Sequence, residues 1–373
     1  MENALPKAAE PQRERKTYLD VLRIIAILFV IFNHTPGYLL YDWFGENTVS
    51  YWLCLGVSIF TNFNVPLFFM ISGALLLGKN ERIRDVFRNR VLWRFLSLAV
   101  FSLLSYGQQV LLRVYPPDIV EALRMMYRTS ENGAYWFLYT YLGFLLCLPF
   151  LRRLAQGLTK TECRYLFILC LIFDAFYRLF TYFVFHDELW LNSQLSIDWI
   201  INRHFVLYVL LGFYLERFPP RSLGRRFDWR VAAVCAGALA GVAFTAVCVW
   251  LRCRVHWEDD NYTDWFHLFK PLYAVAVYVL VRRLDERVSA RRGEKGPGRL
   301  ARCAAYVGRH VFAVYLIHAL VIRIPFFVSI YDQLILTLGP NLFSAGLYTL
   351  LVFAVSLAAA IPLRLIPGVR KIL

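Results

Sequence analysis

Two residues that could do chemistry, Arg23 and His34, lie in one apolar stretch, residues 19–40. A charged or titratable side chain inside a membrane span is costly, and this cost by default indicates a function. Eleven residues separate the two, so a continuous helix would point both side chains the same way, about 16 Å apart along its axis. A neutral imidazole can take a proton from a hydroxyl near neutral pH. The pair therefore predicts general-base chemistry at His34, with Arg23 holding an anion or a neighbouring acid.

Two carboxylates lie near this pair in the sequence. Asp20 shares nearly the same helical stripe as Arg23 and could fix its guanidinium group, whereas Asp42 could orient the imidazole. The structural alternative is that Arg23 only pairs with Asp20 and that His34 makes one hydrogen bond between helices. We predict His34, Arg23 and Asp20 as the catalytic group and leave open which carboxylate orients the histidine.

The elements that must position these residues are membrane-spanning helices. Hydrophobic residues make up 59% of the chain, and its mean hydropathy is +0.49. Apolar stretches of about 20 residues, each long enough to cross a bilayer, recur along its length. The sequence predicts an all-α fold, a polytopic bundle of about ten transmembrane helices at residues 19–40, 51–77, 91–113, 135–151, 164–185, 199–216, 229–251, 264–281, 304–322 and 343–363.

The net charge of +15 is distributed in a way that argues against nucleic acid as a partner. Basic residues gather in every second connection between the predicted spans, and the alternate connections are acidic or mixed. This pattern is typical of polytopic membrane proteins, whose basic loops stay in the cytoplasm. With an even number of spans, we expect a cytoplasmic tail at residues 1–18, a membrane domain at 19–363 and a second cytoplasmic tail at 364–373.

The connection after the second predicted span is dense in arginine. Arg84 and Arg88 are four residues apart, as are Arg90 and Arg94, so each pair would share one face of a helix. Guanidinium groups bind phosphate bidentately. We predict these four arginines as ligands of a phosphate-bearing cofactor. The alternative is a topology signal combined with contacts to anionic lipids.

Other polar and aromatic residues in the apolar stretches could line a substrate pocket. In the second stretch, Gly73 beside Ser72 lets another backbone approach closely. The predicted pocket residues are Asn64, Ser72, Trp136, Tyr139, Tyr315 and His318, and His318 is expected at a depth similar to that of His34. Helix packing is the alternative for each of them. Asp174 and Arg178, four residues apart in the fifth stretch, are expected to form a structural ion pair.

Several common chemical motifs are absent from the sequence. It contains no phosphate-binding G-x-x-x-x-G-K-[ST] loop, no G-x-G-x-x-G, no H-E-x-x-H, no G-x-S-x-G and no C-x-x-C pair. These absences argue against a nucleotide-driven pump, a zinc protease and a serine hydrolase with the usual elbow. No metal is expected.

Four stretches carry a likeness to a known family. They read YLDVLRIIAILFVIFNH, VPLFFMISGALLLG, WFLYTYLGFLLCLPFL and GRHVFAVYLIHALV. With ten spans, they resemble the integral-membrane acyltransferase family 3, and within it the sugar O-acetyltransferase branch. The resemblance implies transfer of an acyl group from coenzyme A to a hydroxyl, with His34 in the catalytic position and Arg23 as its motif partner. The Arg-x-x-Arg pair that many members show after the second span is absent here.

The residues and the resemblance together predict a membrane O-acyltransferase. The expected donor is acetyl-CoA, and the expected acceptor is a glycan or a lipid-linked saccharide; a route through an acyl-enzyme is left open. We expect a multi-pass protein of the bacterial cytoplasmic (inner) membrane. The alternative is a secondary transporter or a flippase of an envelope precursor, because buried Arg and His residues and broken helices occur there too.

Overall fold

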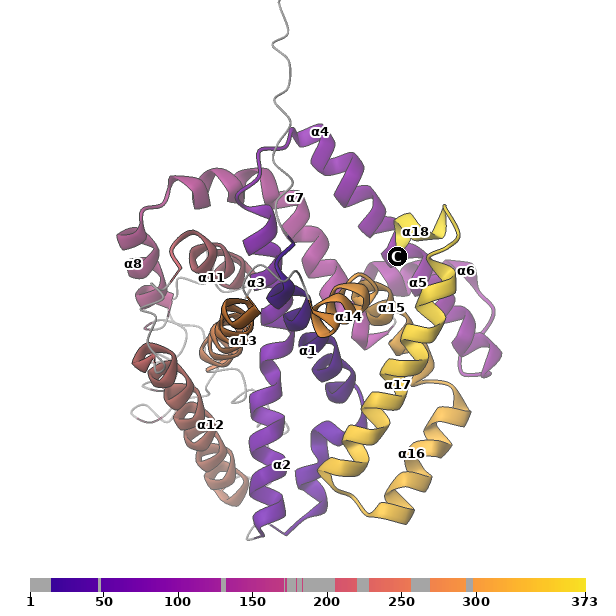
Figure 1. Ribbon diagram of the computed structural model, residues 1–373. Helices are drawn as coiled ribbons and strands as arrows, with labels where there is room; N and C mark the ends of the chain where they lie inside the picture. Colours follow the sequence, from indigo (N-terminus) through magenta and orange to yellow (C-terminus); the bar gives the residue numbers. More distant parts are fainter. Residues whose placement is uncertain are drawn as a thin grey trace, which may run out of the picture.

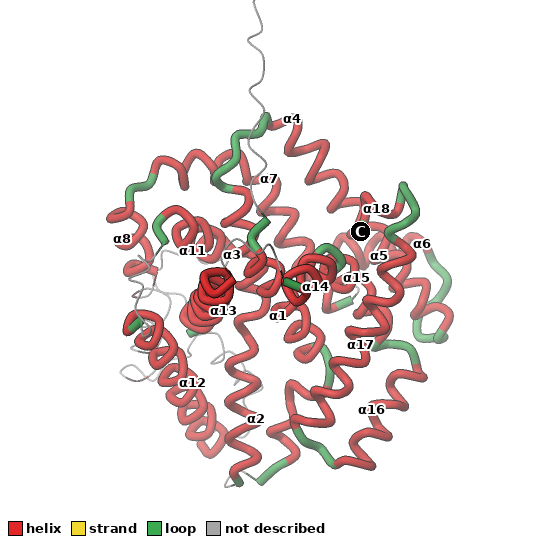
Figure 2. Tube along the Cα trace, in the orientation of Figure 1, coloured by secondary structure: helices red, strands yellow, loops and turns green. Residues whose placement is uncertain are grey.

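The computed structural model describes residues 15–45, 48–128, 132–170, 172, 179, 183, 205–219, 228–255, 269–292 and 298–373. Every regular element in these ranges is a helix, which confirms the all-α prediction (Figure 1, Figure 2). The predicted ion pair Asp174–Arg178 lies outside the described residues.

Five helical segments are long and apolar enough to cross a membrane, and a bent helix pair inclined by 60° makes a sixth if it counts as one span. The chain is therefore an integral membrane protein, while the count of ten spans stays a prediction. The five segments are Val49–Leu76, Ile83–Leu111, Gly133–Gly157, Trp229–Leu251 and Leu342–Leu363, and the bent pair is Arg299–Gly308 with Val311–Val321.

Helix α1 (Thr17–Asn33) lies near the centre of the bundle (Figure 1). Its residues Leu22, Ala26 and Ile27 are fully buried. The helices that pack against it are α3 (Asn64–Leu76), α13 (Lys270–Arg292), α14 (Arg299–Gly308), α15 (Val311–Val321) and α17 (Leu342–Leu363). Side chains on α1 therefore meet residues from distant parts of the chain.

Helix α1 ends at Asn33, which corrects the expectation of one helix through residue 40. The cause is Pro36, because the residue before a proline disfavours helical angles and proline itself lacks the N–H of a helical bond. Thr35 is accordingly extended, with φ −108° and ψ 158°, and the chain continues as the 3₁₀ helix η1 (Pro36–Trp43). His34 thus caps α1, with its N–H 3.0 Å from the carbonyl oxygen of Ile31.

Helices α3 and α11 (Phe205–Arg217) cross with their backbones in contact. A Cβ atom at Gly73 would lie 1.9 Å from the carbonyl oxygen of Val209, and one at Gly212 would lie 1.9 Å from that of Met70. Only glycine fits at these two positions. The close approach predicted at Gly73 is confirmed.

The remaining described helices complete the bundle around this centre. They are α2 (Val49–Phe60), η2 (Thr61–Phe63), α4 (Ile83–Val86), the π-helical η3 (Phe87–Val91), α5 (Leu92–Leu111), α6 (Ile119–Arg128), η4 (Gly133–Tyr135), α7 (Trp136–Gly157), α8 (Lys160–Cys170), α12 (Trp229–Val255), α16 (Pro325–Leu338) and α18 (Val369–Ile372). Figure 1 places α4, α18 and the C-terminal residue toward one end of the molecule.

Candidate active site

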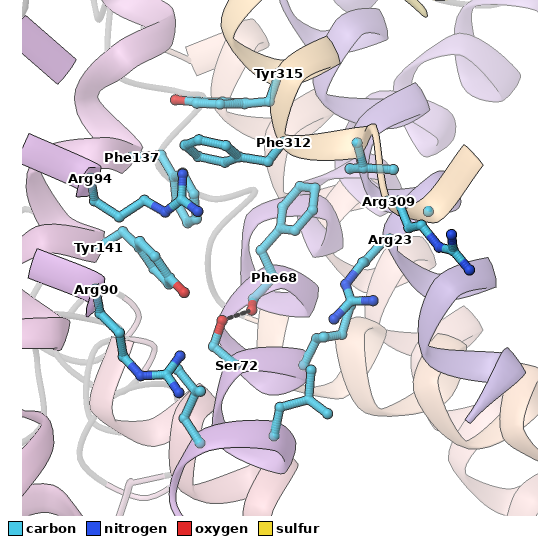
Figure 3. Close-up of a pocket in the computed structure, with 15 residues that line it drawn as sticks. Arg23, Phe68, Ser72, Arg90, Arg94, Phe137, Tyr141, Arg309, Phe312 and Tyr315 are labelled. Carbon is cyan, nitrogen blue, oxygen red and sulfur yellow. Dashed lines mark hydrogen bonds between the residues drawn. The ribbon is translucent and has the colours of Figure 1, made fainter. Parts of the chain in front are cut away.

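A cavity of about 280 Å³ lies between α1, α3, η3–α5, α7 and the junction of α14 with α15 (Figure 3). Figure 3 shows Arg90 and Arg94 on one side of it and Arg23 and Arg309 on the other. Aromatic side chains cover much of the remaining surface: Phe68, Phe137, Tyr141, Phe312 and Tyr315. The cavity thus combines guanidinium groups on two opposite walls with apolar rings between them.

On the α1 wall, Asp20 holds Arg23 in place. The Asp20 side chain is 1% exposed, and its Oδ1 accepts a hydrogen bond of 2.6 Å from Nη1 of Arg23. Arg15 donates to the same carboxylate through its Nε at 2.7 Å. Gly308 packs on this pair, because a Cβ there would lie 2.8 Å from Oδ1 of Asp20. Packing therefore fixes the carboxylate, and the carboxylate fixes Arg23.

On the opposite wall, Glu81 holds Arg90. Nη2 and Nε of Arg90 donate to the two Glu81 oxygens at 2.6 and 2.9 Å, and Arg152 donates to Oε2 at 2.9 Å. Glu81 lies in the connection between α3 and α4. The hydrogen bond from Arg90, followed by that from Arg152, lowers the pKa of Glu81 to about 2. Glu81 therefore stays ionised at neutral pH and orients Arg90 bidentately.

The other two cavity arginines have no carboxylate partner in the described part of the chain. The guanidinium carbon of Arg94 lies 3.9 Å from the centroid of the Phe312 ring, a cation–π contact. Its Nη1 lies 3.4 Å from the carbonyl oxygen of Ile372. The Arg309 side chain lines the cavity from the α14–α15 junction. These two positive charges are available to an anionic ligand.

Two of the four arginines predicted as phosphate ligands lie away from this cavity. Arg84 and Arg88 are both exposed, and Arg88 lines a second hollow of about 540 Å³ with Lys371 and Arg94, so Arg94 lines both. The π-helical turn η3 contains Arg88 and Arg90, one residue of each predicted pair. Because a π turn holds more residues than an α turn, it changes the helical phase of the residues on either side. The structure accordingly brings only Arg90 and Arg94 to the cavity.

A larger hollow of about 960 Å³, here called the vestibule, adjoins the cavity and shares Arg23, Leu75, Gly308 and Arg309 with it. Seven of its lining residues are basic, whereas Asp20 and Glu216 are the acidic ones. The seven are Arg15, Lys16, Arg23, Lys79, Arg217, Arg309 and Arg364. We call the end of the bundle that carries these residues the basic end. The vestibule suits a ligand with several negative charges.

Ring contacts lead from the cavity to the predicted base. Tyr315 lines the cavity, and its ring centroid lies 5.7 Å from that of His318. The centroid of His318 in turn lies 5.6 Å from that of His34. His318 is fully buried, and His34 is partly buried. His34 itself is not among the described residues that line the cavity, so Tyr315 and His318 separate it from the arginines.

The comparison with protein families decides what this arrangement belongs to. The model of the family described as an acyltransferase domain matches residues 16–365. The chain belongs to acyltransferase family 3. The resemblance seen in the sequence is thus confirmed for the family, and the protein is a membrane acyltransferase. Comparison with curated proteins gave no match, and neither did comparison with solved structures.

In this acyltransferase, the predicted pocket residues have different surroundings. Ser72 and Tyr315 line the cavity, and Oγ of Ser72 donates to the carbonyl oxygen of Phe68 at 2.8 Å (Figure 3). Asn64 instead joins α3 to α1, since its Nδ2 donates to the carbonyl oxygen of Phe29 at 3.1 Å. Two further predicted pocket residues, both on α7, lie outside the cavity. Trp136 is 47% exposed, and Tyr139 donates to the carbonyl oxygen of Met126.

Sequence reasoning missed three residues that line the candidate site. Arg309 and Tyr141 line the cavity, and Arg364 lines the vestibule. Arg309 follows Gly308 at the bend between α14 and α15, so a glycine next to an arginine at a helix break was a usable signal. Tyr141 lies two residues beyond the predicted Tyr139, and Arg364 directly follows α17. Nothing in their sequence neighbourhoods separates these two from packing or topology residues.

Proposed function

We propose that the protein is a membrane O-acyltransferase that moves an acyl group, acetyl first of all, from acyl-CoA to a hydroxyl of a glycan or lipid-linked sugar. One observation carries the proposal: a basic vestibule adjoins a cavity with four arginines, and ring contacts continue from there to His34. This order matches a donor with an anionic head and a reactive end, and an acceptor that meets it at a base.

The charges of the site fit acyl-CoA as the donor. Its phosphorylated nucleotide is polyanionic, and guanidinium groups bind phosphates with strong, directional hydrogen bonds. The vestibule supplies five such groups, and Arg94 and Arg309 have no carboxylate partner among the described residues. The pantetheine arm is long and uncharged, which suits the aromatic part of the cavity. Its reach is comparable to the roughly 16 Å between Arg23 and His34 along a helix axis.

His34 supplies the proton chemistry. A ring nitrogen takes the proton of the acceptor hydroxyl as its oxygen attacks the thioester carbonyl carbon. When the tetrahedral intermediate collapses, the carbon–sulfur bond breaks, and the departing thiolate takes the proton from the imidazolium. The products are the ester and free coenzyme A. Partial exposure of His34, beyond the buried His318, favours His34 as the group that meets the acceptor.

The acceptor is a sugar hydroxyl in this proposal, as the likeness to the sugar O-acetyltransferase branch implies. We further propose ten spans in a bacterial cytoplasmic membrane, with the basic end and both termini in the cytoplasm. Arg15, Lys79 and Arg364 at one end of the bundle support this orientation. Lys371→Cys and Asp118→Cys, each in a variant without the eight native cysteines and probed with an impermeant maleimide in intact cells, test it. Labelling of the Lys371 position before permeabilisation would overturn the orientation.

The test of the chemistry uses purified protein in nanodiscs with acetyl-CoA and isolated envelope glycans. His34→Ala is expected to lower thiol release and ester formation by about 10²- to 10⁴-fold, the range for loss of a general base. Its melting midpoint and elution volume should match those of the wild type. Full transfer by a folded His34→Ala variant would remove His34 as the base. Solute uptake without thiol release would favour the transporter.

The product is identified in cells. Mass spectra of envelope glycans from cells with the gene should show a species heavier by one acetyl group than those from cells without it. A difference of one succinyl group would keep the transferase and change the acyl donor. Identical glycans together with changed lipid-linked precursors would move the acceptor to the lipid-linked class.

A further inference from the structure

The orientation of His34 needs a partner that neither nearby carboxylate supplies. Asp20 is hydrogen-bonded to Arg15 and Arg23 at the basic end. Asp42 lies exposed in η1. The His34 ring has no hydrogen bond to any described residue, and His318 is the ring beside it. An imidazole that acts as a base needs one nitrogen protonated and held, so that the other keeps its lone pair.

The hydrogen bonding of His318 fixes its own tautomer. Its side chain is 0% exposed, and Nδ1 lies 2.6 Å from the carbonyl oxygen of Tyr315. A carbonyl oxygen only accepts, so Nδ1 carries the proton and Nε2 carries a lone pair. Nε2 is buried and has no partner among the described residues. A buried acceptor without a donor costs about 1–3 kcal/mol, so a donor is expected next to it.

His34 is placed to orient such a donor, a water between the two rings. The two ring centroids lie 5.6 Å apart, and the ring planes are inclined by 39°. No direct hydrogen bond joins the two rings, and at this separation one bridging water can connect a nitrogen of each. The partners come from helices far apart in sequence, since His34 caps α1 and His318 lies in α15, which packs against α1. The fold therefore builds the pair.

We propose that His318 is a positioning residue: through one bridging water, its unprotonated Nε2 accepts the hydrogen bond that an N–H of His34 starts, which leaves the other His34 nitrogen free to take the acceptor's proton. The inference rests on the proposed role of His34 as the base. The proton passes from the acceptor hydroxyl to His34 and then to the departing thiolate. His318 gains and loses no proton, and the His34 N–H that it holds stays in place throughout.

Two substitutions separate positioning from packing. His318→Leu keeps a buried apolar volume without an acceptor, whereas His318→Gln places an amide oxygen close to the position of Nε2. We expect His318→Leu to lower kcat by about 10- to 100-fold, less than complete loss of a general base. KM for acetyl-CoA should stay within about twofold, because the arginines of the cavity are untouched. His318→Gln should regain most of kcat.

His310 provides the matched control. It is also a buried histidine of this segment, 8% exposed, with Nδ1 2.9 Å from the carbonyl oxygen of Tyr306, and it lies about two helical turns before His318. His310→Leu should leave kcat within about twofold of the wild type. If His318→Leu does not fold, His318→Asn replaces it, since a shorter amide bonds to Tyr315 without reaching the position of Nε2.

Each outcome has one meaning. Wild-type kcat in folded His318→Leu would overturn the positioning role while leaving the proposed function intact. Equal, near-complete loss in His318→Leu and His318→Gln, with normal melting, would assign proton transfer to His318 itself and overturn the division of roles. Full transfer by His34→Ala would instead remove the proposed base, a failure visible before any His318 variant is assayed.

Discussion

Both walls of the cavity hold an arginine by a carboxylate, but the two carboxylates differ in burial. Each carries one arginine paired with a carboxylate and one without such a partner in the described part of the chain. On the α1 wall, the carboxylate of Asp20 is 1% exposed and lies under Gly308. The opposite wall, which carries Arg90 and Arg94, is called the α5 wall here. There the carboxylate of Glu81 is 27% exposed and lies in a connection between helices.

Because of this difference, we expect Asp20 to matter for the stability of the fold and Glu81 to matter for ligand binding. A buried carboxylate that accepts charge-assisted hydrogen bonds is expensive to remove, because its cationic partners lose their compensation. A partly hydrated ion pair contributes far less, since water replaces much of it. Changes at Asp20 should therefore affect the fold, and changes at Glu81 should mainly affect how Arg90 is presented. The arginines without carboxylates should matter chiefly for anionic ligands.

The largest expected effect is on stability at the α1 wall. Asp20→Asn should destabilise the protein by about 3 kcal/mol, because the carboxylate accepts charge-assisted hydrogen bonds from Arg15 and Arg23. The melting midpoint in detergent measures this loss. Asp85→Asn, at an exposed position of α4, is the control and should melt like the wild type. Equal midpoints for the two variants would remove the distinction between the walls.

The next effect concerns the donor. Arg94→Gln and Arg309→Gln should each raise KM for acetyl-CoA by about 10- to 100-fold, the loss of one charge-assisted hydrogen bond to phosphate, with melting unchanged in Arg309→Gln. Arg84→Gln and Arg88→Gln are the matched controls, since both side chains are exposed and away from the cavity. A larger rise in KM for the control pair would indicate that Arg84 and Arg88 bind the phosphates of acetyl-CoA.

A steric test sharpens the α1 side. In Gly308→Ala the new Cβ would lie 2.8 Å from Oδ1 of Asp20, so Asp20 or the α14–α15 junction has to shift. We expect a loss of about 1–3 kcal/mol, as for overpacked sites. Gly346→Ala is the control, because a Cβ there meets nothing within 4 Å. Its melting midpoint should stay equal or rise slightly.

The smallest effect is a pH dependence on the α5 side. Glu81→Gln should cost about 1 kcal/mol at neutral pH, the range for partly exposed ion pairs. Because the folded-state pKa of Glu81 is lowered from 4.5 to about 2, this contribution is fully present above pH 4.5 and is lost as the pH falls toward 2. Melting midpoints of both proteins at a series of pH values test this. A difference that grows on acidification would contradict it.

Much of the architecture could be predicted from local sequence signals. Long apolar stretches indicated membrane helices, and glycine at position 73 indicated a close helix crossing, because both depend on residues that are neighbours along the chain. The proximity of Asp20 and Arg23 followed from helical spacing. Signals of this kind do not need knowledge of which helices pack together.

The rest of the site depends on packing and on breaks in helical phase. Pro36 ends α1 before residue 40, so His34 is the C-terminal cap of α1 and not an interior residue of a longer helix. The π-helical turn Phe87–Val91 decides which arginines reach the cavity, and no residue pattern in this segment predicts a π turn. Arg309 reaches the cavity because α14 packs on α1, which the sequence does not reveal. An arginine at a membrane boundary also serves as a topology signal.

The crossing of α3 and α11 has a mechanical consequence for turnover. With a carbonyl oxygen where a Cβ would sit at both Gly73 and Gly212, these two helices have no free space to slide toward each other. The α3 surface that bears Ser72 is therefore the stationary side of the cavity. We expect a bulky donor to enter and leave by displacement of η3, which Arg90 joins to the partly exposed Glu81.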